Sequence, residues 1–116
     1  MKRITDVKMI TPEQLLNRKW FYILEGKTPV NCDFWQYEKA DRSTWILKKS
    51  EPVPGVEVST IFLGVNLDWR SVDPICFETM IFGGKHDMYR HNYTNYDDAI
   101  DHHNKICLKL FEEQNE

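Results

Sequence analysis

The sequence lacks the motifs that identify most enzymes and metalloproteins. It contains no HExxH or CxxC spacing, and its three cysteines, Cys32, Cys76 and Cys107, lie far apart. It has no glycine-rich phosphate loop, because Gly83-Gly84 is a lone pair that most simply ends a strand. An odd number of scattered cysteines indicates reduced thiols in a cytosolic protein. We therefore expect no cofactor, no metal and no nucleophilic cysteine or serine.

Long hydrophobic runs and basic blocks are also missing. No apolar run approaches the ~18–20 residues that a membrane span requires, and the basic start lacks the apolar core of a signal peptide. The net charge of −3 divides into +4 over residues 1–49, −3 over 50–96 and −4 over 97–116. No block is basic enough for a nucleic-acid arm. We expect one soluble, intracellular domain over residues 1–116, without a membrane partner, and the acidic balance disfavours nucleic acid.

The clearest element is a β-hairpin over residues 56–84. Two apolar runs of strand length, 57–65 and 75–82, flank a polar connection. Glu78 lies in the second run among Cys76, Met80 and Phe82, where an unpaired carboxylate is costly to bury. Two interpretations stay open: Glu78 lies at a rim or pairs with Arg or Lys, or it is a ligand or acid–base group.

Shorter elements precede the hairpin. Residues 1–10 are expected to form an arm, and Thr11-Pro12 predicts the start of a short helix. Residues 20–24 and 44–48 are typical of strands, and Asp33 is the predicted N-cap of a short helix over residues 34–40. Residues 50–55 hold two prolines and a glycine, which predict a loop. We expect Trp20, Trp35 and Trp45 in the core.

The C-terminal helix has the strongest periodicity in the chain. Thr94 and Asp97 predict a capping box at its start. Seven residues recur at helical spacing on one face: Tyr96, Ala99, Ile100, His103, Ile106, Cys107 and Leu110. The tail over residues 112–116 is expected to fray. The whole pattern predicts an α+β fold: an antiparallel sheet of four to five strands, including residues 20–24, 44–48, 57–65 and 75–82, with this helix packed on one face and short helices elsewhere.

Four histidines raise the question of a metal site. Asp98 and His102 are four residues apart on one helix face, and His86 or His91 could add a third ligand. His102 and His103 diverge by ~100° around the helix, so they cannot easily share one ion. No established ligand spacing supports the site. We favour no metal, with His103 facing the core and making one hydrogen bond.

Aromatic and basic side chains gather in the loops at the rim of the hairpin. Such residues on loops commonly anchor binding surfaces, by stacking and by contacting phosphate or carboxylate groups. The alternative is an ordinary solvated loop with its tryptophan folded back on the core. The candidate ligand- or partner-binding residues are Trp69, Arg70, Lys85, His86, Tyr89 and Arg90.

Two sequence strings also carry a family resemblance. VSTIFLG at residues 58–64 and FETMIFGG at residues 77–84, followed by Tyr93-Thr94 before an acidic helix, resemble a small accessory protein family of tailed phages and prophages. The resemblance covers roughly residues 20–103, and His103 and Tyr93 match the family pattern. It implies an accessory phage protein in the host cytoplasm and brings no established activity. Members often carry Asp-His after the glycine of the first strand, where this chain has Asn66-Leu67, so any function of that pair is absent here.

Three classes of function remain open. The first is an accessory protein that acts by binding, either blocking a host protein and so countering host defence or sequestering a nucleotide-like signal. The second is a small nucleotide hydrolase that uses Glu78, Asp68 or a histidine. The third is nucleic-acid binding, which the acidic balance disfavours. The sequence leaves a homo-oligomer open.

Overall fold

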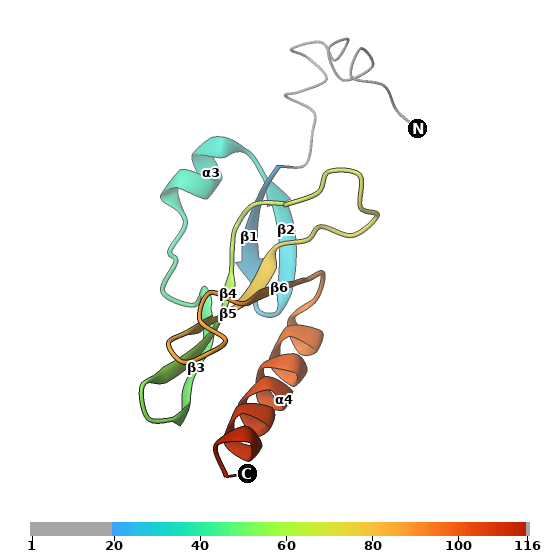
Figure 1. The fold of residues 1–116 in the computed structure, drawn as a ribbon. Helices are drawn as coiled ribbons and strands as arrows, with labels where there is room; N and C mark the ends of the chain where they lie inside the picture. The colour runs from blue at the N-terminus through green and yellow to red at the C-terminus, as the bar shows by residue number, and fades with distance from the viewer. Residues whose placement is uncertain (1–19, 116) are drawn as a thin grey trace.

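The predicted hairpin forms the middle of a four-stranded antiparallel sheet. The strands are β3 (Ile46–Val53), β4 (Val56–Phe62), β5 (Phe77–Phe82) and β6 (Arg90–Tyr93), in that order across the sheet. The helix α4 (Tyr96–Gln114) packs along one face of this sheet (Figure 1). This computed structural model describes residues 20–115, so the arm expected over residues 1–10 and the helix expected from Thr11 lie outside the described residues. The predicted α+β class is confirmed.

The sheet face toward α4 carries three cross-strand rows of different chemistry. The first row is aromatic, the second carries hydroxyl groups and the third is aliphatic; they are Phe62–Phe77–Tyr93, Thr60–Thr79 and Val58–Ile81. Ala99 of α4 packs in the cluster of the first row, and Leu110 packs in the cluster of the third. Two apolar clusters therefore join α4 to the sheet, with a polar row between them.

His103 fills the polar row and has no exposed surface. Its Nδ1 is 2.7 Å from Thr60 Oγ1, and its Nε2 is 2.8 Å from Ser50 Oγ. Thr60 Oγ1 in turn lies 2.5 Å from Thr79 Oγ1. The prediction that His103 faces the core is confirmed, with two hydrogen-bond partners in place of the single one expected.

Residues 20–24 do not join the main sheet, so that part of the prediction was wrong. They form β1 (Phe21–Glu25), which pairs with β2 (Thr28–Cys32) in a separate two-stranded sheet. Gly26, at a positive φ of 62°, makes the tight turn that lets β1 pair with its nearest neighbour in sequence. An isolated bridge between Phe21 and Val65 links this hairpin to the segment after β4, and Tyr22 of β1 is buried in the aromatic cluster of the main sheet.

Residues 50–53, expected in a loop, continue β3 up to Val53. The strand lies at the edge of the sheet, where Pro52 can be accommodated because its missing N–H is not needed on the solvent side. The register shifts between Ser50 and Val53, which places the proline in a bulge. Only Pro54-Gly55 remains as the turn between β3 and β4.

The helix ends confirm one prediction and correct two others. Asp33 caps α3 (Phe34–Lys39) as predicted, and Gln36 completes a capping box with it. In α4 the N-cap is Asn95, whose side chain accepts from the backbone N–H of Asp98, so the predicted Thr94–Asp97 box was wrong. The helix continues to Gln114, through most of the tail expected to fray.

The tryptophans divide between core and surface. Trp45 is buried as predicted, Trp20 is half-buried, and Trp35 is exposed on α3, which contradicts its expected place in the core. Over residues 20–115, no helix is both long and apolar enough to cross a membrane.

Gly64 provides a test of the aromatic cluster. It has a φ of 77°, and a Cβ at this position would lie 2.5 Å from a ring carbon of Trp45 and 2.8 Å from one of Tyr37. We expect Gly64→Ala to lower the free energy of unfolding by about 3 kcal/mol, because backbone strain and overpacking add. Gly26→Ala is the matched control: its φ is also positive, but a Cβ there meets nothing within 4 Å. Equal losses for the two variants in denaturant unfolding would contradict the packing described around Gly64.

His103 makes stability depend on pH. Burial, and then the nearby Lys48 charge, lower the pKa of His103 from 6.5 to about 4. Between those values the unfolded chain binds a proton that the folded chain does not, so stability is complete above pH 6.5 and falls as the pH drops toward 4. We expect this one group to account for roughly 3 kcal/mol of that loss, at about 1.4 kcal/mol per pH unit. Urea titrations at several pH values measure the loss, and His103→Gln should flatten it. An unchanged slope in His103→Gln would assign the pH dependence to other groups.

Candidate functional site

The six predicted binding residues fall into two groups at opposite ends of β5. Trp69 and Arg70 lie in the β4–β5 connection before the strand begins, whereas Lys85, His86 and Tyr89 lie in the β5–β6 loop after it ends, with Arg90 opening β6. A strand of six residues is about 20 Å long. The structure therefore keeps the two groups apart, and the predicted rim is two separate surfaces.

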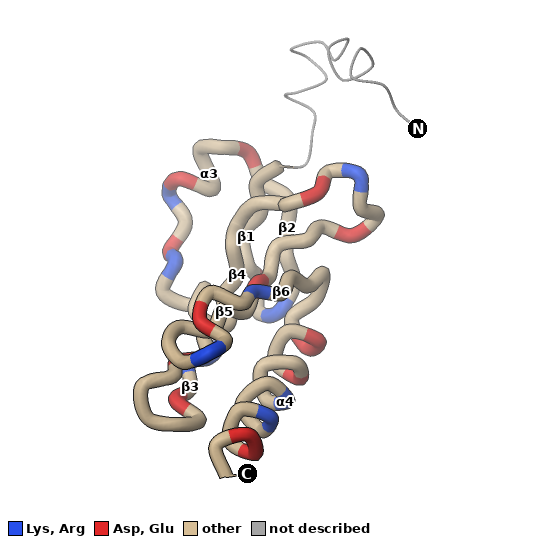
Figure 2. The backbone as a smooth tube through the Cα atoms, in the orientation of Figure 1, with Lys and Arg blue, Asp and Glu red and all other residues tan. Residues whose placement is uncertain are grey.

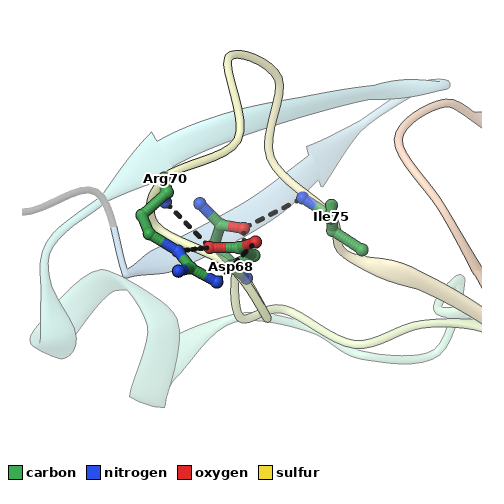
Figure 3. A network of polar contacts seen from close by, with 4 residues as sticks. Asp68, Arg70 and Ile75 are labelled. Carbon is green, nitrogen blue, oxygen red and sulfur yellow. Dashed lines mark hydrogen bonds and ion pairs between the residues drawn. The ribbon is translucent and has the colours of Figure 1, made fainter. Parts of the chain in front are cut away.

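The Trp69–Arg70 group is built around polar contacts within its own connection. Asn66 is buried, and its Oδ1 accepts the backbone N–H groups of Asp68 at 3.1 Å and Ile75 at 2.9 Å. Arg70 donates to the carboxylate of Asp68, through Nε at 3.0 Å and through its backbone N–H at 3.0 Å (Figure 3). These hydrogen bonds lower the pKa of Asp68. The Arg70 guanidinium thus folds back on its neighbour, and the Trp69 side chain is half-buried.

The β5–β6 loop is braced from several sides. The backbone N–H of Gly83 donates to the Asp87 carboxylate at 2.7 Å. The backbone N–H of Met88 donates to the carbonyl of Ile81 at 2.8 Å, which closes the loop on the end of β5. His86 Nε2 lies 3.0 Å from Glu113 Oε2 of α4. Strand, loop and helix are therefore joined by direct hydrogen bonds.

The loop presents apolar side chains to solvent despite these braces. Phe82 at its start, Met88 and Tyr89 have 40%, 56% and 43% of their surface exposed. Met88 also has a φ of 70°, a region that non-glycine residues enter at a cost of order 1 kcal/mol. Strain of this kind persists only where surrounding contacts enforce it, so the loop holds a defined shape with exposed anchors.

Between the loop and α4 lies a hollow that we call the helix–loop groove. It consists of two adjoining cavities of about 220 and 290 Å³. Both are lined by His86, Leu110 and Glu113. The first is also lined by Ile81, Tyr89, His102, Ile106 and Lys109, and the second by Val53, Val56, Gly83, Gly84, Lys85 and Gln114. Three of the predicted residues, Lys85, His86 and Tyr89, therefore line one groove.

Each histidine of the groove is held by one ring nitrogen. The His86–Glu113 hydrogen bond lowers the pKa of Glu113, so this carboxyl stays ionised at neutral pH. Nδ1 of His102 is hydrogen-bonded to the hydroxyl of Tyr93. Burial, followed by the charges of His91 and Lys105, lowers the pKa of His102. His102 is consequently a neutral, oriented imidazole at pH 7.

Charge is distributed unevenly along α4. Figure 2 shows acidic residues in its first turns and at its C-terminal end, with basic residues between them. Lys109 is one of these basic residues and faces the groove, where Lys85 lies 3.9 Å from Glu113. Three groups that can carry positive charge thus surround one carboxylate on the groove wall, namely Lys85, His86 and Lys109.

The other candidate chemical groups do not converge. Glu78 is buried on the sheet face away from α4 and accepts from Asn92 Nδ2 at 3.0 Å, so it does not lie at a rim, and its partner among the described residues is an amide and not Arg or Lys. Asp68 is bound to Arg70 in the β4–β5 connection. Burial raises the pKa of the Cys76 thiol to about 12, which excludes a thiolate there at neutral pH. Among the described residues, no group of three His, Cys, Asp or Glu side chains is placed to hold a metal ion.

Four residues of the groove wall were not predicted as binding residues, although His102 was considered as a metal ligand and Ile106 as part of the apolar face of the helix. His102, Ile106, Lys109 and Glu113 recur at intervals of three and four along α4 and so lie on one flank of the helix. That spacing is visible in the sequence. The more apolar face next to it, however, is the one that predicts how the helix packs. Nothing in the sequence reveals that this flank faces the β5–β6 loop.

Comparisons of the chain with protein-family models, with curated proteins and with solved structures returned no match.

Proposed function

We propose that this protein is a phage accessory protein that acts in the host cytoplasm by binding and blocking a host protein, and that the β5–β6 loop is its main contact surface. The observation that carries the proposal is the combination, in one loop, of exposed apolar anchors and a braced backbone. Met88 and Tyr89 are exposed, while hydrogen bonds to Ile81, Asp87 and Glu113 fix the loop that presents them.

Energetic considerations support a protein partner for such a loop. Aromatic, Met and Arg residues are enriched at the centres of protein interfaces. A rigid loop loses little conformational entropy on binding, so more of its contact energy appears as affinity. Lys85 and Arg90 flank the apolar anchors and favour a partner whose rim is acidic.

The two alternatives receive less support from the geometry. A sponge for a nucleotide-like signal requires a deep pocket lined by Trp, Arg and Tyr, but Trp69 and Arg70 lie at the far end of β5 from Tyr89. A hydrolase built on Glu78 or Asp68 requires these carboxylates to converge with a histidine, and each is engaged elsewhere.

The opposite placement of the two predicted groups makes a direct test possible. We expect Tyr89→Ala and Arg90→Ala each to weaken binding by more than ~1 kcal/mol, because both side chains are exposed and presented by the same braced segment. The measurement is a pull-down from host lysate with the full chain, identification of the captured protein, and calorimetric titration of that protein with each variant.

Arg70→Ala is the matched control, since it removes an exposed arginine from the other end of β5. It should leave the affinity unchanged. Phe77→Ala, which opens a cavity at a fully buried position, should unfold the protein and abolish capture. If Arg70→Ala loses binding and Tyr89→Ala retains it, the contact surface is the β4–β5 connection and not the β5–β6 loop. If neither the wild-type chain nor any folded variant captures a host protein, binding is refuted as the function.

A further inference from the structure

The helix–loop groove places two oriented imidazoles on facing elements. His86 comes from the β5–β6 loop and His102 from α4, and both line the cavity of about 220 Å³. A cavity of this volume holds a phosphate group, which side chains of its lining can contact. Lys109 and Tyr89 line the same cavity.

The orienting contacts leave one nitrogen of each ring to meet a ligand. Glu113 engages Nε2 of His86, which leaves Nδ1. Tyr93 engages Nδ1 of His102, which leaves Nε2. A ring nitrogen held by a second group, with the other nitrogen directed to the reacting atoms, is the arrangement by which general bases and acids are positioned.

The two rings differ in environment, as an acid–base pair requires. His102 belongs to α4 and is neutral at pH 7 because burial lowers its pKa, which suits a base. His86 is hydrogen-bonded to the ionised Glu113 carboxylate, which orients its ring as a general acid is oriented. We therefore assign His102 as the base and His86 as the acid.

We propose that the helix–loop groove is a catalytic site that cleaves the phosphodiester bond of short ribonucleotides by attack of their own 2′-hydroxyl. This activity goes beyond the binding function and does not depend on a protein partner. His102 Nε2 takes the 2′-hydroxyl proton as the 2′-oxygen–phosphorus bond forms. The bond from phosphorus to the 5′-oxygen breaks, and the leaving oxygen takes its proton from His86. The products are a 2′,3′-cyclic phosphate and a 5′-hydroxyl, with no redox change and no co-reactant.

The remaining lining residues fit this substrate class. Lys109 supplies positive charge for the non-bridging phosphate oxygens, and Tyr89 offers a ring face on which a base can stack. The cavity is too small to enclose a dinucleotide, but the reaction requires only the phosphate between the imidazoles, with one nucleoside extending into the adjoining cavity of about 290 Å³. The net charge of −3 disfavours long RNA, so the substrate is short.

The test uses the full chain, the dinucleotide uridylyl-3′,5′-adenosine, and EDTA throughout to suppress metal-dependent nucleases. We expect adenosine and the 2′,3′-cyclic phosphate of uridine as products by chromatography, and no cleavage of the 2′-deoxy analogue. His102→Gln and His86→Gln should each slow the reaction by about 100-fold or more, and Lys109→Ala by about tenfold or more. Lys49→Ala is the matched control, since its side chain pairs with Glu57 away from the groove, and it should react at the wild-type rate.

Tyr93 is a positioning residue and requires a different readout. Tyr93→Phe should lower kcat with little change in KM and displace the acidic limb of the pH profile, because the orientation and pKa of His102 change while the substrate contacts do not. Circular dichroism verifies that each variant is folded. Absence of cleavage by the wild-type chain between pH 5 and 8 would overturn the proposal. Wild-type rates in folded His102→Gln and His86→Gln, or equal cleavage of the 2′-deoxy analogue, would overturn it as well.

Discussion

The interaction on which the structure depends most is the burial of the His103 imidazole between α4 and the sheet. A polar ring without solvent contact is costly unless both of its nitrogens find partners, and here Ser50 and Thr60 provide them. Hydrogen bonds between hydroxyl and imidazole groups require a correct distance and direction, whereas contacts between aliphatic side chains persist when the two surfaces shift slightly against each other. The polar row therefore fixes the rotation and the height of α4 on the sheet more strictly than the two apolar clusters do.

The dimensions of helix and strand allow this fit to extend in both directions. Four residues of a helix advance about 6 Å, and two residues of a strand about 6.6 Å, so helix positions four apart meet successive rows on this face of the sheet. Ala99 meets the aromatic row, His103 the hydroxyl row, and Ile106 and Cys107 pack beside the aliphatic row. With α4 held at this rotation, the neighbouring flank with His102 and Glu113 faces the β5–β6 loop. The groove thus follows from the polar row.

Much of the fold could be predicted because its signals are local. The hairpin strands, the periodicity of α4 and the Asp33 cap each depend on neighbours in sequence. The two main errors have different causes: tertiary context lets an edge position tolerate Pro52 within β3, whereas the local Gly26 turn pairs residues 21–25 with β2 in a separate sheet. The candidate site could be predicted only in part. Aromatic and basic loop residues are visible in the sequence, but only strand direction shows that Trp69 and Tyr89 lie at opposite ends of β5.

The shape of the β5–β6 loop has a second long-range cause. Gly83 has a φ of 92°, and a Cβ at this position would collide with the carbonyl oxygen of Gly55 in the β3–β4 turn. The loop therefore begins in direct backbone contact with that turn, and through His86 it is hydrogen-bonded to α4. A loop held at two points by separate elements cannot shift toward one without leaving the other. This double constraint explains how the chain maintains the positive φ of Met88, because relaxing that residue would require releasing the loop from the turn or from the helix.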